Sequence, residues 1–302
     1  MHNTLTRRKL LEAAALVAGA QLNTRLLPAE TRSGGTVRDR LWLWSHVAGS
    51  YNGEYNLPGQ SRITPVEAAF YLSIPNVFMV ELNGRPPVEQ LEQFAVPFQS
   101  LEQVAWSVVD PQENTPDAER QAVLDFAFKT TNVTGVVMDD FFVHRKSWKE
   151  GQVADLSIDQ LHQMRKILQR GSKRLNLWVV LYEHQIAEPT FPSLAPYLDL
   201  CDVVQVWIWN GKNIPHITGT LDAFEKLLPH KRKVLGCFMW DFGGKKPQPI
   251  ALMQQQCETS LQCLREGRIE GIVFAASWLC DRNLQAVGWT RDWIQRVGRQ
   301  KL

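Results

Sequence analysis

Short apolar runs alternate with helix-forming segments along most of this chain, and this alternation limits the folds that it can adopt. Runs that are apolar throughout are typical of strands buried on both faces of a parallel sheet. The runs are residues 40–46, 76–81, 104–110, 136–140, 175–182, 203–209, 233–240 and 271–276. The first helix-forming segment starts at Thr64, the predicted N-cap. Pro65 follows at the first turn, and Glu67 completes a capping box. The remaining ones are residues 88–93, 117–131, 157–170, 192–198, 220–228, 249–266 and 289–297.

Eight strand–helix units in about 265 residues predict an α/β fold, a single (β/α)8 TIM barrel, which typically takes ~250 residues. The competing fold is a doubly wound open sheet. No Gly-x-Gly-x-x-Gly follows the first strand, and no Gly-x-x-x-x-Gly-Lys-Ser/Thr occurs in the chain. These observations disfavour a dinucleotide site and a P-loop site, and no cofactor is expected.

The first 35 residues are expected to lie outside the barrel. Arg7 and Arg8 precede two leucines, residues 12–20 are rich in alanine, and Ala18-Gly19-Ala20 offers a small-residue cleavage site. The segment resembles a bacterial twin-arginine export signal, which implies a periplasmic or extracellular protein. The alternative is a basic N-terminal helix in a cytosolic protein. The apolar stretch in these 35 residues is too short for a stable membrane span. Residues 36–302 are expected to form the barrel domain.

The charge balance and the cysteine spacing argue against several kinds of ligand and partner. The chain has 33 Lys and Arg against 31 Asp and Glu, a net charge of +2. This balance gives no electrostatic reason to expect nucleic acid or a membrane surface as a partner. None of the five cysteines forms a Cys-x-x-Cys pair, which disfavours a structural zinc site. The pattern does not predict an oligomeric state.

Polar and aromatic residues gather where the predicted strands end. In a barrel these ends converge on one mouth, which is where such folds carry their active sites. The candidate catalytic residues are the carboxylates Asp139, Asp140, Glu183 and Asp241. The candidate substrate-binding residues are Trp44, His46, Glu81, Asn83, Tyr182, His184, Gln185, Trp207, Trp209, Asn210, Trp240 and Trp278.

Carboxylates surrounded by indoles and amides suit glycoside chemistry. Cleavage of a glycosidic bond needs an acid for the leaving oxygen and a negative group to support positive charge at the anomeric carbon. Indole faces stack on the C–H surfaces of sugars, and amides bind hydroxyl groups. The sequence therefore predicts an exported glycoside hydrolase with a carbohydrate substrate.

Asp139 and Asp140 directly follow the apolar run Val136-Val137-Met138. This ending resembles the paired-aspartate signature of family 84 glycoside hydrolases, the O-GlcNAcase type. The resemblance implies substrate-assisted cleavage, in which Asp139 polarises an acetamido group and Asp140 is the acid/base. Because neighbouring strand residues point to opposite faces, one aspartate is expected to line the mouth and the other to brace it.

A different assignment of the carboxylates is also open. If the first aspartate is structural, Glu183 and Asp241 become the acid and the base or nucleophile. For the indoles, only one of Trp207 and Trp209 is expected to face the barrel axis.

Two further classes of function remain. The first is a metal-dependent sugar isomerase, epimerase or lyase, in which the strand-end carboxylates and His184 would hold Mg²⁺ or Mn²⁺. No His-x-His or Glu-x-x-His spacing marks such a site, so no metal ligands are assigned. The second is a carbohydrate-binding barrel without catalysis, which needs the indoles but no acid.

Overall fold

The computed structural model describes residues 35–302 except 112–114, 145, 147–148 and 188–190. Residues Thr36–Leu302 form one compact unit, in which Thr36 forms a β-bridge with Lys301 and so brings the two ends of the unit together. The export signal expected in the first 35 residues falls almost entirely on residues 1–34, outside the described residues, and stays a prediction.

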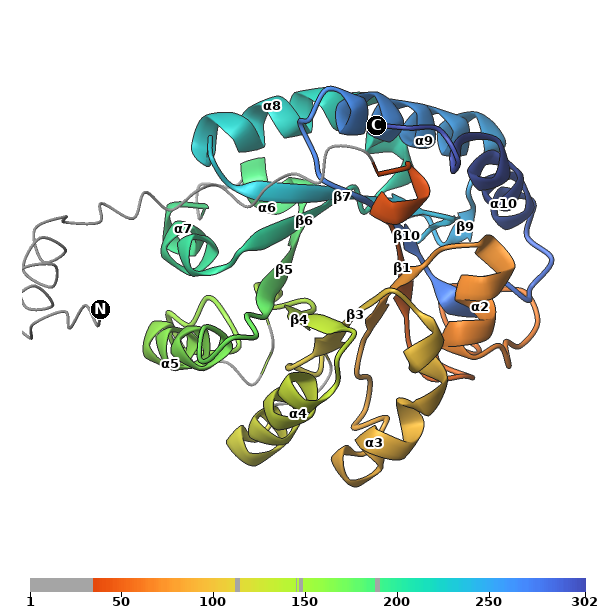
Figure 1. Ribbon diagram of the computed structural model, residues 1–302. Coiled ribbons are helices and arrows are strands. Elements are labelled where there is room, and N and C mark those ends of the chain that lie inside the picture. The colour runs from red at the N-terminus through yellow and green to blue at the C-terminus, as the bar shows by residue number, and fades with distance from the viewer. Residues whose placement is uncertain (1–34, 112–114, 145, 147–148, 188–190) are drawn as a thin grey trace, which may run out of the picture. The chain divides into compact units, whose positions relative to one another are not determined.

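Eight parallel strands close into a barrel in the order β1-β2-β3-β4-β5-β6-β7-β10, so the (β/α)8 prediction is confirmed. Figure 1 shows the strands as a central ring with the helices around it. The strands are β1 Leu41–Ser45, β2 Asn76–Met79, β3 Gln103–Ser107, β4 Val133–Met138, β5 Asn176–Tyr182, β6 Val203–Trp207, β7 Arg232–Phe238 and β10 Ile272–Ala275. Because every connection between them is a parallel crossover, all their carboxyl ends open at the same mouth.

The helices that surround the barrel are α2 Pro65–Leu72, α3 Leu91–Phe94, α4 Asp117–Lys129, α5 Ile158–Leu168, α6 Glu183–Ala187, α7 Phe191–Leu200, α8 Ile217–Leu227, α9 Ile250–Arg265 and α10 Gln285–Val297. Short 3₁₀ helices are η1 Arg38–Arg40, η2 Val88–Gln90, η3 Val96–Ser100, η4 Gly211–His216 and η5 Ser277–Leu279. The predicted capping box of Thr64 and Glu67 begins α2, and Ser157 forms another with Gln160 at α5. No helix in the described part of the chain has the length and apolar character needed to cross a membrane.

Several elements differ from the sequence-based prediction, and β2, β3 and β6 end two or three residues earlier than expected, at Met79, Ser107 and Trp207. The seventh barrel strand ends at Phe238 rather than Trp240, and Trp240–Asp241 forms β8, which pairs antiparallel with β9 Lys246–Pro247. The apolar run continues across this change of direction, so hydrophobicity alone gave no sign of it. Helix α6 was not predicted, because five residues are too few to show helical periodicity.

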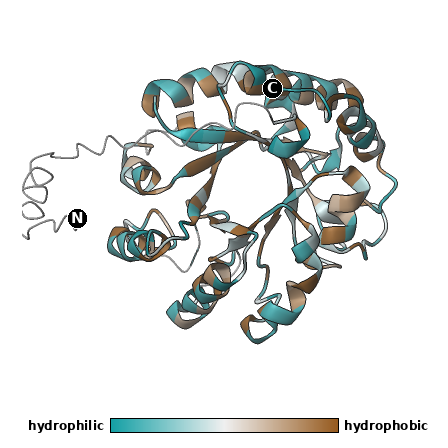
Figure 2. Cartoon of the chain, in the orientation of Figure 1, coloured by the Kyte–Doolittle hydropathy of each residue, from teal (hydrophilic) through white to brown (hydrophobic). Residues whose placement is uncertain are grey.

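Aromatic side chains fill the barrel below the mouth. The Trp42 ring lies 4.6 Å from the Phe78 ring and 5.3 Å from the Trp178 ring, measured between centroids. Above them lies Trp207, and a Cβ atom on Gly236 would overlap its indole ring. Figure 2 shows apolar residues concentrated on the strands, with hydrophilic residues on the outer faces of the helices. This packed interior closes the barrel below its mouth.

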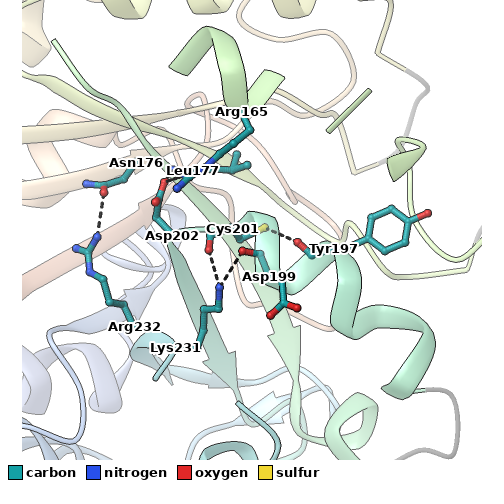
Figure 3. Close-up of polar contacts among 9 residues, drawn as sticks. All are labelled: Arg165, Asn176, Leu177, Tyr197, Asp199, Cys201, Asp202, Lys231 and Arg232. Carbon is teal, nitrogen blue, oxygen red and sulfur yellow. Dashed lines mark hydrogen bonds and ion pairs between the residues drawn. The ribbon is translucent and has the colours of Figure 1, made fainter. Parts of the chain in front are cut away.

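A polar network holds the opposite end of the barrel (Figure 3). The carboxylate of Asp202 accepts a hydrogen bond of 2.8 Å from the backbone N–H of Leu177 and forms an ion pair with Arg165. The Lys231 ammonium donates to the backbone carbonyl of Cys201 at 2.9 Å. These contacts connect the starts of β5, β6 and β7.

Candidate functional site

A pocket lies at the mouth formed by the carboxyl ends of the strands. Its side chains leave a cavity of about 70 Å³. It is lined by Trp44, His46, Tyr51, Tyr55, Asp139, Asp140, Val180, Tyr182, Trp207, Trp209, Phe238, Phe242, Ala275, Ala276 and Trp278.

The pocket contains part of the predicted site. The predicted residues in its lining are Trp44, His46, Asp139, Asp140, Tyr182, Trp207, Trp209 and Trp278. The predicted residues that lie outside the lining are Glu81, Asn83, Glu183, His184, Gln185, Asn210, Trp240 and Asp241. The structure therefore separates the adjacent aspartates from the other two candidate catalytic carboxylates.

Both aspartates line the pocket, whereas one was expected to line the mouth and the other to brace it. Strand β4 ends at Met138, and Asp140 has a φ of 45°, in the left-handed region. The alternation of side chains holds for extended backbone and fails at this turn. Aspartate is among the few residues other than glycine that adopt this conformation readily. The turn thus brings two neighbouring carboxyl groups to one surface.

Tyr182, the last residue of β5, is hydrogen-bonded to the aspartate pair. Its hydroxyl group donates to Oδ1 of Asp140 at 2.7 Å. Burial, followed by the charges of Asp140 and Asp139, raises the pKa of Tyr182 well above its ordinary value. The phenol therefore keeps its proton at neutral pH and remains a donor to the carboxylate.

Tyr51 and Tyr55 also line the pocket, and sequence reasoning did not select them. Both belong to the loop between β1 and α2, and both have positive φ values, 56° and 50°. Burial is the main cause that raises the pKa of each phenol, and the charges of Asp139 and Asp140 add to it. The loop is rich in aromatic and turn-forming residues, but nothing in that pattern shows which way it folds.

Indole and phenyl rings form the walls of the pocket. Trp209 stacks on Phe242 with ring centroids 5.8 Å apart, and Trp207 packs on Phe238 at 4.7 Å. Both tryptophans line the pocket, so the expectation that only one faces the axis is wrong. Strand β6 ends at Trp207, so Trp209 lies beyond the strand and its indole reaches the pocket from the segment that follows.

His46 is a neutral group in the pocket wall. Its Nδ1 accepts a hydrogen bond of 3.2 Å from the indole Nε1 of Trp278. Burial lowers the pKa of His46 to about 3. The proton of the neutral ring is therefore assigned to Nε2, which is buried and has no hydrogen-bond partner among the described residues.

Glu183 and Asp241 support loops. Oε2 of Glu183 accepts the backbone N–H of Trp209 at 2.9 Å. Oδ1 of Asp241 accepts the backbone N–H groups of Gly211 and Gly244 at 3.0 and 2.8 Å. These hydrogen bonds account for the placement of both side chains behind the pocket wall. An acid or base role for either residue stays a prediction without support from the lining.

Two other predicted residues support pocket tyrosines from behind. The indole Nε1 of Trp240 donates to the backbone carbonyl of Tyr55 at 3.2 Å. Oε1 of Gln185 accepts the backbone N–H of Tyr182 at 2.9 Å. Both side chains therefore act on the pocket through the tyrosine backbone.

The remaining predicted residues lie at the edges of the mouth. The side chain of Asn210 accepts the backbone N–H of Lys212 and caps η4. His184 stacks on the outer side of Tyr182 with ring centroids 5.6 Å apart. Glu81 is buried after the end of β2, and Asn83 lies in the following turn with a φ of 55°.

Metal-binding groups of three or more His, Cys, Asp or Glu side chains do not occur among the residues that the structure describes. The carboxylates and the histidine considered for Mg²⁺ or Mn²⁺ are divided between the pocket and the loops behind it. The described residues therefore supply no ligand set for the isomerase, epimerase or lyase alternative.

Comparison with solved structures identifies the class of fold. The chain resembles active domain 2 of a chitinase from Pyrococcus furiosus, with a TM-score of 0.57 and 11% identity over 89% of this chain and 99% of that one. A second structure of this chitinase domain, in complex with chito-oligosaccharides, matches with a TM-score of 0.53 and 13% identity, over 80% of this chain and 85% of that one. A proposed α-L-fucosidase from Bacteroides thetaiotaomicron matches with a TM-score of 0.52 and 9% identity, over 94% of this chain and 99% of that one.

These likenesses show the fold alone, a (β/α)8 barrel. No protein-family model matches the chain, and no curated protein matches its sequence. The function must therefore be argued from the pocket.

Proposed function

We propose that this protein is a glycoside hydrolase whose reaction takes place at Asp139 and Asp140. The observation that supports it best is the placement of two adjacent carboxyl groups in a small pocket walled by indoles and phenols. A sugar ring can stack on the indoles while its glycosidic oxygen lies against a carboxyl group. The barrel neighbours with glycosidase names are consistent with this proposal.

The adjacent carboxyl groups suit a substrate with an acetamido group next to the bond that breaks. The acetamido oxygen bonds to the anomeric carbon as the glycosidic C–O bond breaks, and Asp140 gives its proton to the leaving oxygen. Asp139 accepts a hydrogen bond from the acetamido N–H and supports the developing positive charge. Water then attacks the anomeric carbon of the cyclic intermediate as the bond to the acetamido oxygen breaks, which restores the acetamido group, and one proton of the water returns to Asp140.

Tyr182 has a defined part in this scheme. Its hydroxyl group occupies Oδ1 of Asp140, so the carboxyl group is fixed in orientation. The same hydrogen bond stabilises the carboxylate that remains after the proton has left. His46 offers its Nε2–H as a neutral donor in the pocket wall.

The test is a screen of the purified protein against aryl glycosides, N-acetylhexosaminides among them. We expect Asp139→Asn and Asp140→Asn to lower kcat by about 100-fold or more, the usual loss on removing an acid or base. Glu183→Gln is the matched control, because glutamine keeps an acceptor for the Trp209 N–H. Loss of turnover in Glu183→Gln with normal turnover in both aspartate variants would refute the assignment. Sugar binding without turnover in the wild type favours a binding barrel instead.

We also propose that the protein is exported, on the strength of Arg7-Arg8 and the Ala-rich stretch after them. Replacing both arginines by lysine is expected to retain the protein in the cytoplasm. Cell fractionation measures this directly, and unchanged export of the double-lysine variant contradicts the proposal.

A further inference from the structure

We propose that Arg282 is a positioning residue, which holds the loop that carries Tyr51 and Tyr55 against the pocket. Its effect on turnover rests on the proposed function, whereas its effect on the loop does not. Arg282 lies outside the pocket lining, so it acts through the tyrosines and not on a ligand.

Arg282 is 7% exposed, and its guanidinium donates from all three of its nitrogens. Nη1 donates to the backbone carbonyls of Pro58 and Gly59 at 3.0 and 2.6 Å. Nη2 donates to Oδ1 of Asn52 at 2.6 Å, and Nε donates to the carbonyl of Trp278 at 2.8 Å. Burial of a charged group is costly unless its donors are satisfied, and here four hydrogen bonds to neutral oxygens reduce that cost. One side chain thus joins the β1–α2 loop to the segment after β10.

The contact with Asn52 places this clamp next to the pocket. Asn52 is the residue after Tyr51, and its side chain also forms two hydrogen bonds with the backbone of Ser61, of 2.8 and 3.1 Å. Arg282 therefore holds the two sides of the loop together at the point where Tyr51 enters the pocket. The Tyr51 and Trp278 ring centroids lie 4.7 Å apart, and Arg282 also donates to the backbone carbonyl of Trp278.

The backbone of the loop explains why such a clamp is needed. Tyr51, Tyr55 and Asn56 all have positive φ values, which bulky side chains rarely adopt without external contacts. Asp281 adds a second anchor, because its carboxylate accepts the backbone N–H groups of Arg62 and Ile63 at 2.7 and 3.0 Å. Asp281 fixes only the end of the loop before α2, and Trp240 holds the carbonyl of Tyr55, so the segment around Tyr51 and Asn52 depends on Arg282.

The experiment compares Arg282→Met and Arg282→Lys with the wild type. Arg268→Met is the matched control, because Arg268 also makes several hydrogen bonds, to Asp222 and Glu225. Arg268 precedes β10, at the end of the barrel away from the pocket. Lysine keeps the charge of arginine but not its planar fork of donors.

The first measurement is chymotrypsin cleavage after Tyr51 and Tyr55 in the folded protein, which needs no activity. We expect cleavage to be about tenfold faster in Arg282→Met, intermediate in Arg282→Lys and unchanged in Arg268→Met. If Arg282→Met does not fold, Arg282→Lys gives the same comparison. Cleavage of the folded Arg282 variant at the wild-type rate overturns the proposal.

The second measurement is kcat/KM, with KM and kcat determined separately. We expect Arg282→Met to lower kcat/KM by about 10-fold to 100-fold, with partial rescue in Arg282→Lys, because misplaced binding groups reduce productive binding. Arg268→Met should match the wild type. Unchanged kinetics alongside faster cleavage refutes the role in the reaction. If the wild type hydrolyses no glycoside, the proposed function fails, and the cleavage rates alone decide whether Arg282 holds the loop.

Discussion

Asp140 owes its position to its backbone conformation and to a neighbouring strand. Its φ of 45° turns the chain at the end of β4, and the hydroxyl group of Tyr182 on β5 fixes its carboxyl group. A left-handed conformation costs an ordinary residue roughly 1–2 kcal/mol, and it persists where surrounding contacts hold it. The hydrogen bond from a buried phenol is such a contact, and it links the conformation to the proposed chemistry.

Replacing Tyr182 by phenylalanine tests this link, because the ring stays and the hydrogen bond goes. We expect kcat to fall by about 10-fold to 100-fold, since a hydrogen bond to a charged group is worth about 1.5–3 kcal/mol. Without the phenol, Asp140 holds its proton more tightly, so the alkaline limb of the rate profile moves to higher pH. The measurement is kcat from about pH 4 to about pH 9.

Tyr197→Phe is the control for this change, because Tyr197 packs on Phe141 outside the pocket. The pKa of the Tyr182 phenol is raised, so its own ionisation adds no limb below its ordinary value. A Tyr182→Phe variant with the wild-type profile would show that the hydrogen bond does not serve the acid.

At single residues, sequence reasoning reached the carboxylates and indoles of the site that lie at strand ends, but it missed Phe238 and Ala275, which end β7 and β10. Asp139, Asp140 and the indoles follow apolar runs, so the barrel geometry places them. Tyr51 and Tyr55 could not be found in this way, because their position depends on Arg282, more than 220 residues further along the chain. Contacts of this kind leave no local pattern.

At the scale of the elements, the packing of β6 on β7 sets the floor of the pocket. Gly236 lies on β7 where any Cβ would overlap the indole of Trp207 on β6. We expect Gly236→Ala to destabilise the protein by roughly 1–3 kcal/mol or more, the cost of overpacking a core. That corresponds to a fall in Tm of several degrees for a domain of this size.

Gly219 provides the matched control for the glycine substitution. It lies in α8, where a Cβ meets no atom within 4 Å. Alanine is favoured over glycine inside a helix, so Gly219→Ala should stabilise the fold by roughly 0.5–1 kcal/mol. Thermal unfolding of both variants measures the difference, and equal effects would contradict the close approach of Trp207 to Gly236.

The order of the elements was predictable because apolar runs and helix caps repeat along the chain. The residues at which elements end were harder to predict, because the apolar run of β7 continues into β8 after the chain has left the barrel. Glu183 and Asp241 were misleading for the same reason. Both follow apolar runs, but the backbone turns there and directs their carboxylates to loop N–H groups.

Across the whole molecule, the two ends of the barrel have different tasks. The end with Asp202 and Lys231 joins strands through ion pairs and carbonyl contacts (Figure 3). The mouth instead buries polar groups around a cavity, His46 among them. A neutral histidine buried at the mouth links the site to the stability of the entire fold.

Burial lowers the pKa of His46 from 6.5 to about 3 in the folded protein. Below about pH 6.5 the unfolded chain takes up a proton that the folded protein does not, so stability falls with pH until about pH 3. The loss from this group is about 1.4 kcal/mol per pH unit in that window. In His46→Gln the loss is absent, and the other titrating groups cancel in the comparison.

We therefore expect His46→Gln to be less stable than the wild type at neutral pH, where it disrupts the hydrogen bond from Trp278. As the pH falls towards about 4, the difference should shrink and then reverse. The measurement is the free energy of unfolding in urea at several pH values, with exposed His162→Gln as the control. The curve of unfolding free energy against pH for His162→Gln should run parallel to that of the wild type. A parallel curve for His46→Gln would instead show that His46 takes up its proton in the folded protein as readily as in the unfolded chain.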